Sequence, residues 1–408
     1  MILLLVLPGL AATLTVGSSG YSDLPAAIAD ASDGDTISVE AGTWVGCADL
    51  GGKDLTLLGA GADSTVLVGD GSCDSALVLS SGEDATIEDL TVTNTAGRGV
   101  EIAGGVVTLT RVAIRDSGDL SLDGGGISVS GAVVTLQDCT LADNTGVSGG
   151  HVYLSESILQ ISGGTYSGGV ASGLGGAVGA GDTTTGSTVE ITGATFTGNQ
   201  ASYGGALSLI GDHTLSSADT LWEDNVATYG SGGAMLMETV TASVSGDTFQ
   251  DNQAALGATT FPALPVGYGG AIFATHAVSL AITDVVFDGN DAETDGGALA
   301  VNWGDEVIVS DCTFTDQRSV ERGGAVALNA VVSAEITGAT FRGNTSVQGG
   351  ALFLIDSAAI WLSDSVFNKW PHLLWPLFLL SVVYLVIVTA VVARLLCSPN
   401  TNVVTENE

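Results

Sequence analysis

Short stretches in which apolar and polar residues alternate recur along most of the chain. Residues 188–192 (TVEIT) and 206–209 (ALSL) show the pattern, and glycine and aspartate separate such stretches. Alternation with a period of two places apolar side chains on one face of a β-strand and polar ones on the other. The pattern predicts many short strands joined by tight turns, and therefore an all-β fold.

The strand pattern is part of a longer repeat that is marked by Gly-Gly pairs. Pairs beginning at 204, 232, 269, 296, 323 and 349 are separated by 28, 37, 27, 27 and 26 residues, and earlier pairs begin at 149 and 175. Most pairs follow a large apolar residue that has Asn or Gln three positions later: Leu141/Asn144, Phe196/Asn199, Trp222/Asn225, Phe249/Asn252, Phe287/Asn290, Phe314/Gln317 and Phe341/Asn344. One such unit cannot bury its own apolar side chains, whereas stacked units bury them against each other. We therefore predict a solenoid of roughly 13 coils over residues 13–368.

Each recurrent residue has a structural role in a stack of coils. We expect the large apolar side chain to point into the coil and stack on its equivalents, and the Asn to lie at a tight corner with αL backbone and amide hydrogen bonds. Gly-Gly would form the next corner, which needs positive φ and close approach of backbones. Asp and Gly interchange three residues before the large apolar residue and two residues after it. This exchange is typical of turns rather than of fixed metal ligands.

The repeats also resemble known families. Residues 195–209 (TFTGNQASYGGALSL), 286–301 (VFDGNDAETDGGALAV) and 340–354 (TFRGNTSVQGGALFL) resemble the repeat of the polymorphic outer membrane proteins, surface adhesins with right-handed parallel β-helical passengers. Residues 26–44 (AAIADASDGDTISVEAGTW) resemble the opening of pectin-lyase-like β-helix proteins, in which a short helix caps the first coil. The resemblance implies a right-handed parallel β-helix. It does not imply autotransport, because the adhesin family ends in a membrane β-barrel and this chain ends in one hydrophobic segment.

Both ends of the chain carry signals for export and membrane insertion. Residues 1–12 (MILLLVLPGLAA) are an apolar run followed by small residues and predict a signal peptide, with a buried first strand as the alternative. Residues 373–393 are free of charge and long enough to cross a bilayer, so we predict a transmembrane helix over 371–396, with a buried core helix as the alternative. The tail 397–408 would then be cytoplasmic. The expected protein is a single-pass cell-surface protein with an extracellular N-terminal domain.

Charge excludes two classes of partner. The chain has 45 acidic and 9 basic residues, a formal net charge of −36, and no Lys or Arg lies between Asp116 and Gln317. Nucleic acids and anionic membrane surfaces need clusters of Lys and Arg, so we expect neither as a partner. Disorder is also excluded, because 45% of the residues are hydrophobic and can form a core.

The cysteines predict one disulfide. Cys47 and Cys73 are 26 residues apart, which is one repeat, so they would lie side by side on adjacent coils. We predict that they form a disulfide in an oxidising compartment. Cys139 and Cys312 share one repeat position but lie too many coils apart to pair, so we expect buried thiols. Cys397, just past the predicted span, is a candidate for lipidation.

The sequence offers no catalytic constellation. Pectin-lyase-like enzymes use Arg or Lys bases near Asp clusters, and the central part of this chain has no base, while His151, His213 and His276 share no repeat position. We therefore expect no catalytic residue, no cofactor and no dedicated metal site. Two pairs of acids, Asp224/Asp251 and Asp284/Asp311, would stack on adjacent coils and repel each other, so weak Ca²⁺ binding is a hypothesis.

The predicted function is non-catalytic binding of a glycan or protein at the cell surface, as an adhesin-like module. Two alternatives stay open: a polysaccharide lyase or glycoside hydrolase of the pectin-lyase-like class, and a structural surface spacer. An insertion at 254–268 breaks the repeat and is a candidate recognition loop, in which Tyr268 would be exposed. The alternative is a loop folded flat on the rod.

Overall fold

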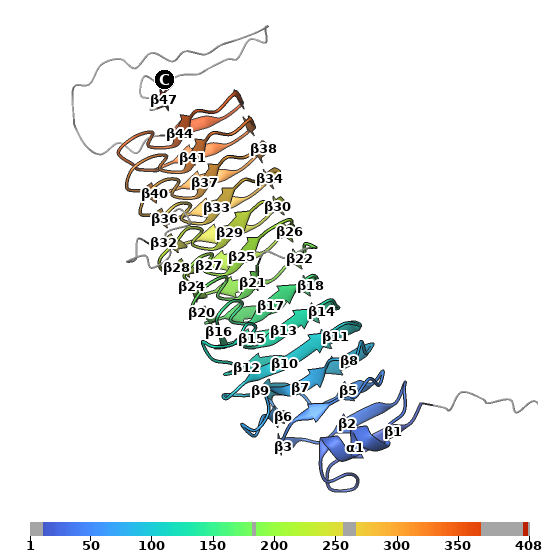
Figure 1. Ribbon diagram of the computed structural model, residues 1–408. Helices are drawn as coiled ribbons and strands as arrows, with labels where there is room; N and C mark the ends of the chain where they lie inside the picture. Colours follow the sequence, from blue (N-terminus) through green and yellow to red (C-terminus); the bar gives the residue numbers. More distant parts are fainter. Residues whose placement is uncertain (1–10, 182–184, 256–266, 369–402, 407–408) are drawn as a thin grey trace, which may run out of the picture.

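The computed structural model describes residues 11–181, 185–255, 267–368 and 403–406. The chain winds into a straight rod of about 13 coils, a parallel β-helix (Figure 1). Each coil runs through three long sheets, which we call A, B and C, and from the sixth coil to the twelfth a short fourth sheet D lies between B and C. All strand pairs are parallel and join one coil to the next. The predicted solenoid is confirmed.

Sheets A and B run along the whole rod. Sheet A contains β1 (Thr13–Val16), β2 (Thr36–Val39), β5 (Thr56–Leu58), β8 (Ala85–Glu88), β11 (Val106–Thr110), β14 (Val133–Gln137), β18 (Ile158–Ser162), β22 (Thr188–Thr192), β26 (Thr214–Ala218), β30 (Thr241–Ser245), β34 (Ser279–Thr283), β38 (Glu306–Ser310), β42 (Ser333–Thr337) and β45 (Ala359–Ser363). Sheet B contains β3 (Gly42–Val45), β6 (Thr65–Val68), β9 (Thr91–Thr93), β12 (Ala113–Arg115), β15 (Thr140–Ala142), β19 (Thr165–Ser167), β23 (Thr195–Thr197), β27 (Leu221–Glu223), β31 (Thr248–Gln250), β35 (Val286–Asp288), β39 (Thr313–Thr315), β43 (Thr340–Arg342) and β46 (Val366–Asn368).

Sheets C and D complete the coils. Sheet C contains β4 (Ala48–Asp49), β7 (Ser75–Leu79), β10 (Arg98–Ala103), β13 (Ile127–Ser130), β17 (Val152–Ser155), β21 (Val178–Ala180), β25 (Leu207–Ile210), β29 (Met235–Glu238), β33 (Ile272–Thr275), β37 (Leu299–Asn302), β41 (Val326–Asn329), β44 (Leu352–Ile355) and β47 (Val403–Glu406). Sheet D contains β16 (Thr145–Gly146), β20 (Val170–Ala171), β24 (Gln200–Ala201), β28 (Val226–Ala227), β32 (Gln253–Ala254), β36 (Asp291–Ala292) and β40 (Arg318–Ser319).

The two ends of the rod differ. At the N-terminal end a short helix, α1 (Leu24–Asp30), lies against the first coil and buries Leu24, Ala27 and Ile28, which confirms the expected cap. At the other end, β47 from within the predicted tail pairs with β44. Among the described residues no helix is long and apolar enough to span a bilayer. The predicted span 371–396 and residues 1–10 of the predicted signal peptide lie outside them.

A stack of aromatic rings runs through the core. Nearly parallel rings lie one above another, beginning with Tyr166, Phe196 and Trp222 and continuing with five phenylalanines, with neighbouring centroids 4.3 to 5.9 Å apart. The later members of the stack are Phe249, Phe287, Phe314, Phe341 and Phe367. This is the predicted stacking of the large residue of each repeat.

The repeat Asn forms a second internal ladder through its side-chain amide, as expected, but its backbone does not adopt the expected αL conformation. Asn225, for example, is fully buried, and its amide donates to Phe196 O at 3.0 Å and to the Asn252 Oδ1 of the next coil at 3.0 Å. The αL residue is not the Asn but its predecessor, Asp224, with φ of 54°. The predecessor turns the backbone, and this leaves the Asn side chain inside the coil.

The Gly-Gly pair serves the two purposes expected of it. The first glycine has positive φ, as at Gly204 with 61°. The second approaches the next coil so closely that a Cβ on Gly205 would collide with the carbonyl oxygen of Gly233. Both glycines are therefore required by geometry.

Candidate functional site

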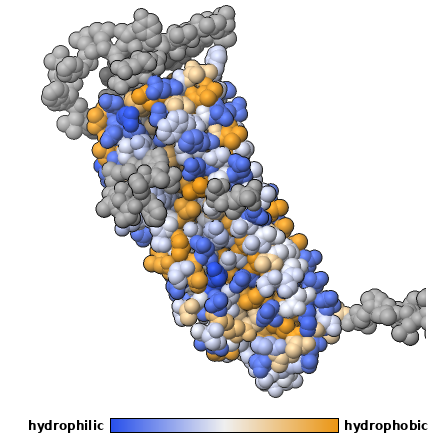
Figure 2. All heavy atoms as spheres, viewed as in Figure 1, coloured by the Kyte–Doolittle hydropathy of each residue, from blue (hydrophilic) through white to orange (hydrophobic). Residues whose placement is uncertain are grey.

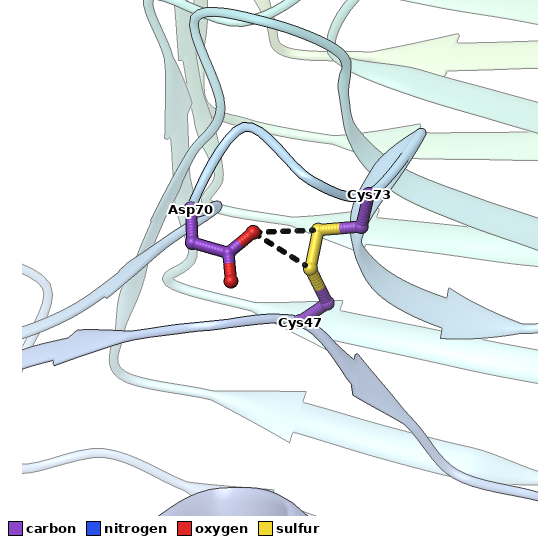
Figure 3. A group of neighbouring side chains, drawn as sticks. All are labelled: Cys47, Asp70 and Cys73. Atoms are coloured by element: carbon purple, nitrogen blue, oxygen red, sulfur yellow. Dashed lines mark hydrogen bonds between the residues drawn. A yellow bond between two sulfur atoms is a disulfide. The ribbon is translucent and has the colours of Figure 1, made fainter.

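The predicted disulfide lies near the N-terminal end of the rod. Cys47 and Cys73 are bonded to each other on adjacent coils, with their Cα atoms 6.2 Å apart (Figure 3). The other two described cysteines, Cys139 and Cys312, are free and buried, and burial raises the pKa of each thiol to about 11. They are inert thiols, as expected. Cys397 lies outside the described residues.

Asp70 lies beside the disulfide but does not make it a metal centre. Its Oδ1 is 3.5 Å from Cys47 Sγ and 3.8 Å from Cys73 Sγ. A disulfide sulfur has no proton to donate and is not a thiolate ligand, so these are packing contacts. The carboxylate is held by the hydroxyl and the backbone N–H of Ser72, and these two hydrogen bonds lower the pKa of Asp70.

The acidic corners have the turn geometry that the sequence indicated. Every Asp at the two predicted positions has φ between 50° and 55°, including Asp224, Asp251, Asp284 and Asp311. In several coils the carboxylate reaches over the corner glycine of the next coil, so that a Cβ on Gly289 would collide with Asp251 Oδ1. There is therefore a second reason why Asp and Gly interchange at these corners. A glycine leaves room for the carboxylate of the Asp at the same corner of the preceding coil.

Two of the three histidines of the rod are internal. His213 is buried and its Nδ1 accepts from Ser187 N at 2.8 Å. His151 is also buried, and its Nδ1 lies 3.0 Å from Asn144 Nδ2. It fills the gap that Gly169 leaves in the Asn ladder, since a Cβ at 169 would lie 2.8 Å from His151 Nε2. Burial lowers the pKa of His151 to about 3, so it is neutral and structural.

The third histidine belongs to an exposed aromatic pair. His276 follows β33 and Trp303 follows β37, and both occupy the αL position at the corner from sheet C to sheet A, with φ of 50° and 54°. Their rings are stacked across adjacent coils, with centroids 5.3 Å apart and planes inclined by 17°. The Trp303 residue is 51% exposed. An exposed, oriented indole ring is a binding surface for flat, partly apolar ligands.

Polar side chains line the pair on its sheet C side. Thr275, Asn302 and Asn329 are in register on β33, β37 and β41, which lie side by side near the C-terminal end of the rod (Figure 1). Thr275 Oγ1 lies 3.1 Å from His276 Nδ1 and fixes that ring. Within the described part of the chain neither Asn amide has a hydrogen-bond partner, although Asn302 is only 6% exposed. We call His276, Trp303, Thr275, Asn302 and Asn329 the corner platform.

An apolar cluster covers the neighbouring part of sheet C. Leu236, Phe273 and Ala300 point outward from their strands but are buried under Tyr203 and Tyr268. Tyr268 lies over Phe273 with ring centroids 5.7 Å apart, so the expectation that it would be exposed is wrong. The rest of the proposed recognition loop, 256–266, lies outside the described residues. Elsewhere on this face hydrophilic and hydrophobic residues are interspersed (Figure 2).

The sequence contains a signal for the corner platform that shared positions of one residue type do not reveal. His276 and Trp303 are 27 residues apart, which is one coil, and each follows the last residue of a sheet C strand. The signal is a pair of ring side chains of different type at the repeat spacing, outside the buried positions.

Comparisons with known proteins agree on the fold. The family model of the right-handed β-helix region matches residues 69–215. The catalytic domain of a GH87 α-1,3-glucanase in complex with tetrasaccharides is similar in structure, with 13% identity, a TM-score of 0.50, and coverage of 89% of this chain and 69% of that one. The catalytic unit of a GH87 α-1,3-glucanase from Streptomyces thermodiastaticus gives 16% identity, a TM-score of 0.39, and coverage of 89% and 68%.

A pectin methylesterase from carrot is a further similar structure, with 11% identity, a TM-score of 0.28, and coverage of 88% of each chain. No curated protein sequence matches the chain. The protein is thus a parallel β-helix that matches the right-handed β-helix region over residues 69–215, and its likeness to the solved structures concerns the fold alone. The finer resemblance to polymorphic outer membrane protein repeats stays a prediction.

Proposed function

We propose that this protein is a glycan-binding, adhesin-like module displayed at a cell surface, and that the corner platform is its binding site. The observation that carries the proposal is the exposed Trp303 ring, which is stacked on His276 and flanked by two asparagine amides that have no hydrogen-bond partner among the described residues. A pyranose ring has an apolar face and polar edges. It therefore suits an indole surface next to groups that both donate and accept hydrogen bonds.

The compartment belongs to the same proposal. A Cys47–Cys73 disulfide suits an oxidising environment outside the cytoplasm. The signal peptide 1–12 and the transmembrane helix 371–396 would place the rod outside the cell with the tail 397–408 inside. The fold is also shared with proteins that act on glycans, such as the α-1,3-glucanase bound to tetrasaccharides.

The test is a glycan array on the full-length chain, followed by calorimetry with the best ligand. We expect Trp303→Ala to lower affinity at least tenfold, equivalent to about 1.4 kcal/mol. The matched control is Trp361→Ala, because Trp361 is also exposed, at 64%, but lies on sheet A. Equal losses in both variants would mean unspecific adsorption. A wild-type chain that binds no glycan would favour the structural spacer instead.

One observation favours the glycoside hydrolase alternative. Burial, followed by the charges of Asp316 and Asp251, raises the pKa of Asp288 at the end of β35. A carboxylic acid with a raised pKa beside a second carboxyl group is the arrangement that glycosidases use for acid and base. If Asp288, Asp251 and Asp316 are catalytic, Asp288→Asn abolishes release of reducing ends from the ligand found on the array. Trp303→Ala then only lowers the rate of release. No release by the wild type rejects the alternative.

A further inference from the structure

The Trp303 ring has one covered face and one open face. His276 covers the face toward the preceding coil. The next residue at the same corner of the following coil is Ala330, with φ of 53°, and its methyl group does not extend the stack. Since the rings stack along the rod axis, the open face of Trp303 is directed toward the space above Ala330.

The corner beyond Ala330 closes this space on the far side. Asp356 occupies the same αL position one coil further on, with φ of 50°, because β37, β41 and β44 are in register. Two coil spacings, about 9.6 Å, therefore separate the backbones at 303 and 356. Interior rings of this protein stack at 4.3 to 5.9 Å. One ring inserted above Ala330 would thus lie at stacking distance from Trp303 and in contact with Asp356.

The polar groups around the space define what the inserted ring should carry. Asn329, which precedes Ala330, offers an amide oxygen and an amide NH₂. Asp356 is exposed, and its carboxylate has no hydrogen-bond or ion-pair partner among the described residues. Two bases of the neighbouring coils, Arg318 and Arg322, are paired with Asp291 and Asp295. An anionic sugar would meet only negative charge here, whereas an ammonium group would pair with Asp356.

The geometry points to a binding slot for one sugar ring of an amine-bearing glycan, stacked on Trp303 above Ala330 with its ammonium group on Asp356. This inference rests on the proposed glycan-binding function and names the ligand class and the position of the ring. The rod would bind such a polymer through a free amino sugar and would reject uronates.

The experiment measures binding of the full-length chain to three hexamers: glucosamine, N-acetylglucosamine and galacturonate. We expect the glucosamine hexamer to bind about three- to fivefold more tightly than its N-acetylated counterpart, as an exposed ion pair allows, and the galacturonate hexamer not to bind. Asp356→Asn should remove the preference and leave the affinity for the N-acetylated hexamer unchanged. About 1 M salt should do the same, since charges are then screened beyond about 3 Å.

Two bulky substitutions at the same corner locate the slot. Ala330→Trp fills it and should abolish binding with an unchanged melting temperature, because Trp303 already shows that this αL corner accepts tryptophan. Thr239→Trp, on the other side of His276 and with φ of 59°, is the matched control and should keep full binding. Full binding by Ala330→Trp would overturn the proposed position.

The outcomes separate the two proposals. If no hexamer and no array glycan binds, the proposed function fails. If a glycan binds and Trp303→Ala abolishes this, but the N-acetylated or galacturonate hexamer binds as well as the glucosamine hexamer, the function stands and the amino-sugar inference is wrong.

Discussion

The protein contains two aromatic stacks built by the same repeat, one inside the rod and one on its surface. The inner stack is continuous from Tyr166 to Phe367, and each ring between them is covered on both faces. The outer stack consists of His276 and Trp303 and ends at Ala330, so one face of Trp303 stays open. A solenoid places equivalent residues of adjacent coils in contact, both inside the rod and on its surface. A ring that is covered on both faces contributes only to the structure, whereas a ring with one uncovered face is available to a ligand.

The two tryptophans show the same contrast in their indole N–H groups. Trp222 is fully buried and its Nε1 donates to Asp247 Oδ2 at 2.9 Å. Trp303 Nε1 has no partner among the residues that the structure describes, and its exposure leaves the group to solvent or to a ligand. The inner tryptophan is satisfied by the protein, whereas the outer one is not.

The largest expected effect comes from breaking the inner stack. Phe314→Ala removes a fully buried ring that lies 4.8 Å from each neighbour, and should lower the free energy of unfolding by about 3 to 5 kcal/mol. Trp303→Ala is the matched change on the surface and should alter the free energy of unfolding by no more than about 0.5 kcal/mol. Urea unfolding of both variants measures the difference. Equal destabilisation would contradict the separation into a structural and a binding stack.

Asp247, which accepts the hydrogen bond of the Trp222 indole, makes the stability of the protein depend on pH. Asp247 is buried and accepts from Trp222 Nε1 and from Thr220 N at 2.9 Å, and from the Ser217 hydroxyl. Burial, with a smaller contribution from the charge of Asp219, raises its pKa from 3.8 to about 6. The unfolded chain releases this proton near pH 4 and the folded chain near pH 6. Stability from this group is therefore full below about pH 4 and is lost as pH rises to 6, by about 3 kcal/mol.

Asp247→Asn isolates this contribution, because other carboxylates such as Asp89 have lowered pKa values and act in the opposite direction. We expect the difference in melting temperature between the variant and the wild type to grow in favour of the variant between pH 4 and 6. Asn retains an acceptor for the Trp222 N–H, so the stack should persist. A difference that is independent of pH would show that Asp247 does not titrate in this range.

The Asn ladder should respond less strongly than the rings. Asn252→Ala leaves the backbone N–H and the amide of Asn225 without their shared acceptor, which should cost about 2 kcal/mol. Asn329→Ala, in the corner platform, breaks no hydrogen bond within the described residues and should be neutral for stability. Thermal unfolding distinguishes them, and a neutral Asn252→Ala would mean that water replaces the missing side chain.

The sequence predicted the inner stack because its members share one residue class at one spacing. Phe287, Phe314 and Phe341 differ by 27 residues and are all large and apolar, so their stacking follows from the repeat alone. The disulfide followed in the same way from the spacing of Cys47 and Cys73. What could not be predicted was which residue adopts αL, since Asp224 and Asn225 both suit that conformation.

The corner that carries the platform was harder to predict because its residues have no common type. His276, Trp303, Ala330 and Asp356 occupy one position in four successive coils, and only their backbone conformation is shared. Exposed positions of a solenoid are not constrained by packing, so their residues vary from coil to coil. The proposed binding site therefore lies at an exposed corner where the residue type is free to vary, and the three-dimensional register is needed to bring its residues together.

The smallest expected effect tests whether His276 positions Trp303. His276→Ala removes the ring 5.3 Å from the indole but no group that the proposed ligand contacts, so the indole gains rotational freedom. Fixing one such side chain is worth about 0.5 to 1.5 kcal/mol in binding, which predicts a two- to tenfold loss of affinity with an unchanged melting temperature. His276→Phe restores a stacked ring and should restore binding. If Ala and Phe variants bind equally well, the outer stack does not orient Trp303, and the comparison with the inner stack fails at that point.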